Sequence, residues 1–84
     1  MNLTYYTFQE LSILVEEYIT QQRAGFTLRG LYSYIAYWGM EDHRLPGHQL
    51  PPEQQQAVGQ ILERIVRDGR IREQDDGEYI KMIS

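Results

Sequence analysis

The chain contains no cysteine. This absence excludes a disulfide scaffold, a zinc site built from thiolates and a cysteine nucleophile. Small secreted domains usually depend on disulfides for their stability, because their cores are too small to hold them alone. We therefore expect a cytoplasmic protein.

Long apolar stretches are missing too. No run approaches the roughly 20 apolar residues of a membrane-spanning helix, and the first residues lack the basic start and apolar segment of a signal peptide. The composition, with 42% apolar and 24% charged residues, is typical of a globular protein. From 84 residues we expect a single domain, residues 1–84, without a membrane partner.

An excess of basic residues is the third absence. The net charge is −4, whereas nucleic-acid binders usually carry more Lys and Arg than Asp and Glu. The charge is unevenly distributed. Residues 1–50 and 73–84 are net negative, and residues 51–72, with four basic and three acidic groups, are net positive. The only positive segment is therefore the one that we predict as the third helix and the turn after it.

Recognisable catalytic motifs are absent as well. No serine has the flanking glycines of a nucleophile elbow, and the glycines are not spaced as a phosphate-binding loop. His43 and His48 lie near Glu41 and Asp42, but their spacing matches no zinc motif. We expect no metal, no cofactor and no enzymatic activity.

The first helix is predicted over residues 7–24, after an N-terminal arm of residues 1–6. Thr7 and Glu10 have the spacing of a capping box, and Ala24-Gly25 offers a left-handed cap at the other end. Apolar residues at helical spacing predict one buried face. Its members are Phe8, Leu11, Leu14, Val15, Tyr18 and Ile19.

The second helix is predicted over residues 27–39, with Thr27 as its N-cap and Gly39 as its end. Phe26, just before it, could form a strand of one or two residues. Gly30 inside the helix costs about 1 kcal/mol relative to Ala, so we expect another helix to approach it closely. The predicted buried face consists of Leu28, Leu31, Tyr34, Ile35 and Trp38.

A loop over residues 40–50 follows, and it is either functional or a tolerated insertion. The third helix is predicted over residues 51–68, since Pro51-Pro52 suits a first turn and Asp68-Gly69 ends the pattern. Residues 70–83 read as a hairpin around Asp76-Gly77. We expect an α+β fold, mainly α, of three helices and a C-terminal two-stranded β-hairpin. The apolar stripe of the third helix is Val58, Ile61, Leu62, Ile65 and Val66.

The run from Leu62 to Ile71, followed by Asp76-Gly77-Glu78-Tyr79, resembles winged helix-turn-helix domains. In that family the third helix commonly ends in an apolar and charged run, then Asp-Gly or a similar pair, then a strand and a wing. The resemblance covers nearly the whole chain. It implies a winged-helix domain whose third helix enters the DNA major groove while the hairpin touches the flanking backbone or minor groove.

The resemblance thus implies a small DNA-binding regulator of transcription. We expect it to act on double-stranded DNA as a homodimer, because one module supplies few cationic contacts. Glutamine can read adenine, and arginine can read guanine or hold phosphate. The third helix would supply Gln55, Gln56, Gln60, Arg64 and Arg67, and phosphate contacts would come from Arg29, Arg70 and Arg72.

A second hypothesis uses the same fold without DNA. The hairpin tip, residues 73–78, holds four carboxylates, whereas a DNA-binding wing is usually basic. Many winged helices serve instead as protein-interaction modules, such as adaptors or inhibitors. The interface residues would be Tyr37, which should be exposed, together with Ile13 and Tyr5. Ile13 is either simply exposed or in contact with the arm (Leu3, Tyr5) or a second subunit.

Overall fold

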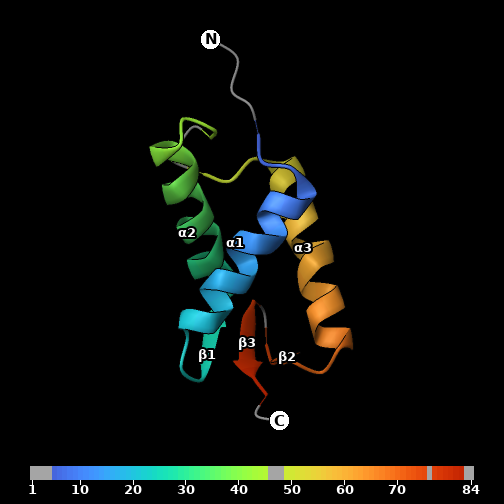
Figure 1. The fold of residues 1–84 in the computed structure, drawn as a ribbon. Helices are drawn as coiled ribbons and strands as arrows, with labels where there is room; N and C mark the ends of the chain where they lie inside the picture. Colours follow the sequence, from blue (N-terminus) through green and yellow to red (C-terminus); the bar gives the residue numbers. More distant parts are fainter. Residues whose placement is uncertain (1–4, 46–48, 76, 83–84) are drawn as a thin grey trace.

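A computed structural model describes residues 5–45, 49–75 and 77–82. In these residues the chain forms three helices and a three-stranded antiparallel sheet (Figure 1). The α+β, mainly α fold predicted from the sequence is confirmed. In chain order the elements are α1 (Phe8–Gln21), β1 (Gly25–Thr27), α2 (Leu28–Glu41), α3 (Pro52–Arg67), β2 (Ile71–Glu73) and β3 (Glu78–Lys81).

The sheet has the order β1-β3-β2. The predicted hairpin is β2 and β3, in which Arg72 pairs with Ile80. On the other side of β3, Phe26 of β1 pairs with Tyr79. The short strand suggested at Phe26 is therefore a third, full partner in the sheet. This arrangement is compatible with a winged-helix-like domain. Asp76 and Ile83 of the predicted hairpin lie outside the described residues.

The hairpin turn is attached to the start of α2. The backbone N–H of Leu28 donates to the carbonyl oxygen of Gly77 at 2.5 Å, and Gly77 has a φ of 74°, which glycine adopts without strain. Next to the sheet, the N–H of Lys81 donates to the carbonyl of Ala24 at 2.6 Å. The hairpin is therefore held against the helices along β1 and at its turn.

The core lies where α1 crosses α2 and α3 (Figure 1). The segment between α2 and α3 contributes to it as well, because Leu45 and Leu50 are buried. That segment is therefore packed at two points, on either side of residues 46–48, which lie outside the described part. The largest side chains that are fully buried are Leu11, Leu31, Ile35, Leu62, Ile71, Val15 and Val58.

The end of α2 differs from the prediction. Gly39 lies inside the helix and is buried, because the side chain of Leu45 fills the space where a Cβ on Gly39 would stand. The helix ends at Glu41, and His43 takes up the left-handed conformation with a φ of 56°. The N–H groups of His43 and Arg44 donate to the carbonyls of Met40 and Gly39. This is a Schellman motif with histidine in the place usual for glycine.

At Gly25 and Gly30 as well, a neighbouring element lies where a side chain would stand. The helix α1 ends at Gln21, before the predicted cap, and Gly25 begins β1 instead. A Cβ on Gly25 would stand 2.5 Å from the carbonyl oxygen of Tyr79. At Gly30 it would stand 2.6 Å from the Tyr18 hydroxyl of α1, which confirms the expected close approach of a helix. At the end of α3, Gly69 has a φ of 80° and is the predicted stop.

Three residues predicted to be buried are exposed. They are Phe8, Trp38 and Val66, one on each helix. Each is the first or last member of its apolar stripe along the chain, and a domain of this size has no further layer to cover such an end.

Candidate functional site

The outer side of α3 carries four of the predicted DNA-contacting residues. Gln56, Gln60, Arg64 and Arg67 are all exposed there. Within the residues that the structure describes, Arg64 and Arg67 form no ion pair. The structure therefore brings two arginines and two glutamines together on one helix face.

Carboxylates balance the charge of that face. Glu53 and Glu63 are exposed on α3, so two acidic groups stand among the two arginines. A groove of about 340 Å³ lies between α3 and the hairpin, and Glu63 and Arg67 of α3 line it together with Glu73 of β2. The face offers phosphate no net positive charge.

The remaining predicted contacts are scattered, and two are engaged within the domain. The side-chain amide of Gln55 donates to the carbonyl of Leu50 at 2.8 Å. The guanidinium of Arg70 donates to both carboxylate oxygens of Glu16, one of them at 2.7 Å. The hydrogen bonds from Arg70 lower the pKa of the Glu16 carboxyl group. Arg29 at the start of α2 and Arg72 on β2 are exposed.

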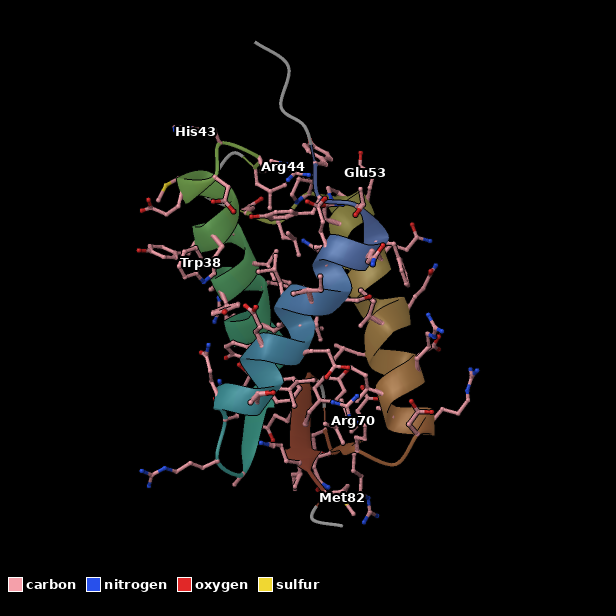
Figure 2. All side chains as sticks on the ribbon, in the orientation of Figure 1. Trp38, His43, Arg44, Glu53, Arg70 and Met82 are labelled. Carbon is pink, nitrogen blue, oxygen red and sulfur yellow. The ribbon has the colours of Figure 1, made fainter. Side chains whose placement is uncertain are left out.

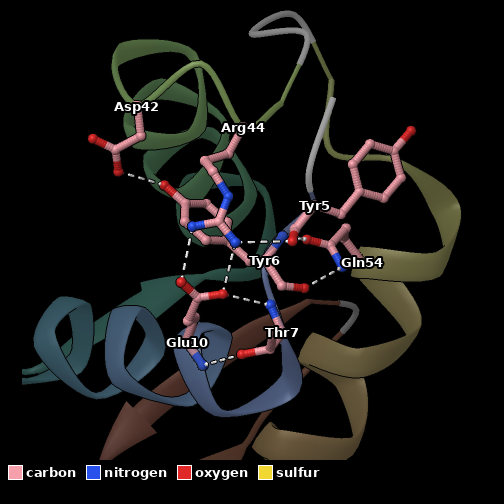
Figure 3. Close-up of polar contacts among 7 residues, drawn as sticks. All are labelled: Tyr5, Tyr6, Thr7, Glu10, Asp42, Arg44 and Gln54. Carbon is pink, nitrogen blue, oxygen red and sulfur yellow. Dashed lines mark hydrogen bonds and ion pairs between the residues drawn. The ribbon is translucent and has the colours of Figure 1, made fainter. Parts of the chain in front are cut away.

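Sequence reasoning missed a polar cluster at the entry to α1 (Figure 3). Arg44 donates to the two carboxylate oxygens of Glu10 at 2.8 and 2.7 Å and to the carbonyl of Tyr5 at 2.9 Å. Its guanidinium lies 4.7 Å from the ring centroid of Tyr6. The Tyr6 hydroxyl donates to Asp42 at 2.8 Å. Burial, followed by that hydrogen bond, raises the pKa of Tyr6.

Gln54 belongs to the same region. It is buried, and its side chain accepts from the N–H of Tyr6 at 3.1 Å and donates to the carbonyl of Tyr6 at 3.2 Å (Figure 3). The sequence shows it only as the first of three glutamines, so no local pattern distinguished it from its exposed neighbour Gln56. Its contacts, like those of Arg44, hold the chain in place before α1.

A continuous row of aromatic rings crosses the domain from the sheet to the outer side of α2. At one end the buried Phe26 stacks on the partly buried Tyr79, and the other end is exposed. Successive ring centroids lie 5.0 to 6.4 Å apart. The order along the row is Tyr79, Phe26, Tyr18, Tyr34, Trp38 and Tyr37.

The exposed end of this row is a candidate interface, which we call the aromatic face and define as Tyr34, Tyr37 and Trp38. The side chains of Tyr37 and Trp38 are 52% and 41% exposed. Figure 2 shows Trp38 on the outer side of α2, away from α3. The exposure of Tyr37 is as predicted, whereas Trp38 was expected in the core.

The structure places the three predicted interface residues on different elements, with Tyr37 on α2, Ile13 on α1 and Tyr5 in the segment before α1. Ile13 is exposed on the outer side of α1, among polar residues that include Glu16 and Glu17. Tyr5 precedes α1, where its carbonyl is held by Arg44. The suggested contact between Ile13 and Leu3 involves a residue outside the described part.

Neither a metal centre nor a membrane span emerges from the described residues. No three His, Asp or Glu side chains in residues 5–45, 49–75 and 77–82 are grouped so that they could hold a metal ion, and His48 lies outside these ranges. None of the described helices is long and apolar enough to cross a membrane.

Comparison with known proteins assigns no family: no family model, no curated protein and no solved structure matches this chain.

Proposed function

We propose that this chain is a protein-interaction module of winged-helix type that binds its partner through the aromatic face. The observation that carries the proposal is Trp38, which is 41% exposed and yet in ring contact with both Tyr34 and Tyr37. Tryptophan and tyrosine are the residue types that most often dominate the binding energy of protein interfaces.

The aromatic face is organised before any partner arrives. Tyr34 packs on Tyr18 at 5.0 Å, and Tyr18 packs on the buried Phe26 at 5.7 Å. Ordering a free side chain on binding costs about 0.5–1.5 kcal/mol. Rings that already rest on the core avoid part of that cost, which favours a role in binding.

Photo-crosslinking tests the proposal. A benzophenone amino acid is placed at Met40, which is exposed one turn after Tyr37, in cells from which the chain comes. We expect a discrete crosslinked protein whose yield falls strongly when Trp38→Ala is added. A retained helical circular-dichroism spectrum shows that the variant is folded.

The matched control places the same crosslinker at Gln56, on the outer side of α3. It should give no such product. Equal crosslinking from both positions, or none from Met40, would overturn the proposal.

A second candidate is binding of duplex DNA by α3, acting as a dimer. The observation that favours it is the row of Gln60, Arg64 and Arg67, residue types that read base edges and hold phosphates. The three helices and the sheet of order β1-β3-β2 are also compatible with a winged-helix-like arrangement.

Fluorescence anisotropy with a random DNA duplex tests this candidate. Binding should weaken steeply as salt rises, because phosphate contacts release counterions, and Arg64→Ala with Arg67→Ala should flatten that slope. Glu63→Gln, on the same helix, should not reduce binding. No binding at low salt, by a dimer verified in a sedimentation run, counts against the candidate.

A further inference from the structure

We infer that the aromatic face binds a cationic segment of the partner protein. An arginine or lysine side chain would lie against the rings of Trp38 and Tyr37, with Glu41 and Glu17 as counter-charges. The inference rests on the proposed function and adds the chemistry of the partner to it.

The geometry of the rings suits a cation. Trp38 meets Tyr34 at an interplanar angle of 71° and Tyr37 at 77°. The rings therefore form a corner whose faces point in different directions, and half of the Tyr37 surface is open. The face of an aromatic ring attracts an ammonium or guanidinium group, and tryptophan does so most strongly.

Carboxylates border the aromatic face on both helices. Glu41 is exposed and lies one helical turn after Tyr37 and Trp38, on the same side of α2. On α1, the Gln21 side chain donates to the Tyr34 hydroxyl at 3.4 Å. Glu17 is exposed one turn before Gln21 on that side of the helix. The surroundings of the rings are therefore acidic.

The basic groups of α2 and of the segment that follows it do not offset that charge. Arg23 lies outside both, two residues after α1 ends at Gln21. Arg29 lies at the opposite end of α2, more than two turns from Trp38. The guanidinium of Arg44 is ion-paired with Glu10 at 2.7 Å. A second copy of the chain would bring the same carboxylates together, and like charges repel. Charge complementarity thus favours a basic partner.

The chain already holds one of its own arginines with the same groups. The guanidinium of Arg44 lies 4.7 Å above the ring of Tyr6 and is hydrogen-bonded to the carboxylate of Glu10 (Figure 3). In this protein an aromatic ring and a glutamate, together with the carbonyl of Tyr5, hold a guanidinium in place. The aromatic face presents the same combination, with Trp38 and Glu41, to the outside.

Trp38 reports on its own surroundings because it is the only tryptophan of the chain. The test titrates the protein with a helical peptide that carries leucine on one face and arginine on the other, and follows tryptophan emission. We expect a saturable change that weakens as salt rises, since exposed charges are screened beyond about 8 Å at physiological ionic strength.

Variants make the assignment specific. Tyr37→Ser and Glu41→Gln should each weaken peptide binding by about threefold or more, the scale of one cation–π contact or exposed charge pair. Both positions are exposed, so the fold should persist. Glu63→Gln on α3 is the matched control and should bind as the unchanged protein does.

The outcomes separate the alternatives. Equal binding of a leucine and glutamine peptide would overturn the cationic partner. A shift in tryptophan emission when only the protein concentration is raised would also overturn it, because a second copy of the chain would then cover the aromatic face. If the peptide fails while crosslinking from Met40 succeeds, the inference falls and the proposed function stands; if both fail, both fall.

Discussion

At the scale of single residues, the position of the segment before α1 depends on a side chain that forms the hydrogen bonds usually formed by the backbone of a neighbouring strand. Gln54 offers one amide donor and one carbonyl acceptor to Tyr6, as a neighbouring strand would, at 3.2 and 3.1 Å. The two residues are separated by 48 positions. Because both groups of Tyr6 are thereby satisfied away from water, the chain before α1 can lie against α3.

Replacing Gln54 should therefore destabilise the domain. Gln54→Leu leaves the buried N–H and C=O of Tyr6 without partners, and an unsatisfied buried group costs about 1–3 kcal/mol. We expect the free energy of unfolding, measured in urea, to fall by about 2 kcal/mol or more. Gln56→Leu, at an exposed position of the same helix, should change it by less than about 0.5 kcal/mol.

The two left-handed helix caps provide a second test. His43 adopts a φ of 56° without being a glycine, so His43→Gly should raise the free energy of unfolding by about 0.5–1 kcal/mol. Gly69→Ala, at a φ of 80°, should lower it by about 1 kcal/mol. Thermal unfolding measures both changes in stability. Shifts of the same sign would contradict the left-handed conformation of His43 and Gly69 after α2 and α3.

At the scale of elements, the helix–helix and helix–loop contacts decide what a glycine does. Gly39 and Gly59 both lie inside helices. Leu45 occupies the space beside Gly39, whereas nothing lies within 4 Å of the place where a Cβ on Gly59 would stand. The packing therefore has no room for a side chain at position 39, whereas position 59 can hold any residue that favours a helix.

The same substitution should therefore have opposite effects at the two positions. Gly59→Ala should stabilise the domain by about 0.8–1 kcal/mol, the gain in helix propensity. Gly39→Ala should destabilise it by about 1–3 kcal/mol, because the methyl group overlaps the buried Leu45 side chain. The melting temperatures of the two variants should lie on opposite sides of that of the unchanged protein.

At the scale of the whole molecule, two ion pairs join α1 to the segments that follow α2 and α3. They are Glu10 with Arg44 and Glu16 with Arg70. The hydrogen bonds from Arg44, with that from the backbone of Thr7, lower the pKa of Glu10 from 4.5 to about 2. The pKa of Glu16 is lowered by Arg70. The ionised carboxylates thus favour the folded state.

The sign of the pH dependence follows from these pKa values. The stabilisation of the folded state by the two ionised carboxylates is fully present above the pKa of the unfolded chain, near 4.5. It is lost as the pH falls toward the lower pKa of the folded state. We expect Glu10→Gln to have a lower melting temperature than the unchanged protein at pH 7. The difference should shrink between about pH 4.5 and pH 2.

An exposed glutamate without an ion pair in the described part of the chain serves as the control. Glu63→Gln should leave the acid dependence of the melting temperature almost unchanged. A difference for Glu10→Gln that stays constant down to pH 2 would show that packing, rather than charge, is responsible.

The sequence alone determined the features that depend on residues close along the chain. The capping box of Thr7 and Glu10 is formed as predicted, and Asp68-Gly69 ends α3. Gly77, with its positive φ, lies in the turn of the predicted hairpin. Each involves bonds within a few positions, so the local pattern contains all the information that it requires.

Only the tertiary structure decided the features that depend on distant neighbours. Gly39 is a contact for Leu45 and not a helix end. Arg44 meets Glu10 across 34 positions. The aromatic face shows the limit most clearly: helical spacing identified Tyr37 as exposed but assigned Trp38 to the core. Periodicity gives the direction of a side chain from its helix, whereas its exposure depends on where the neighbouring elements end.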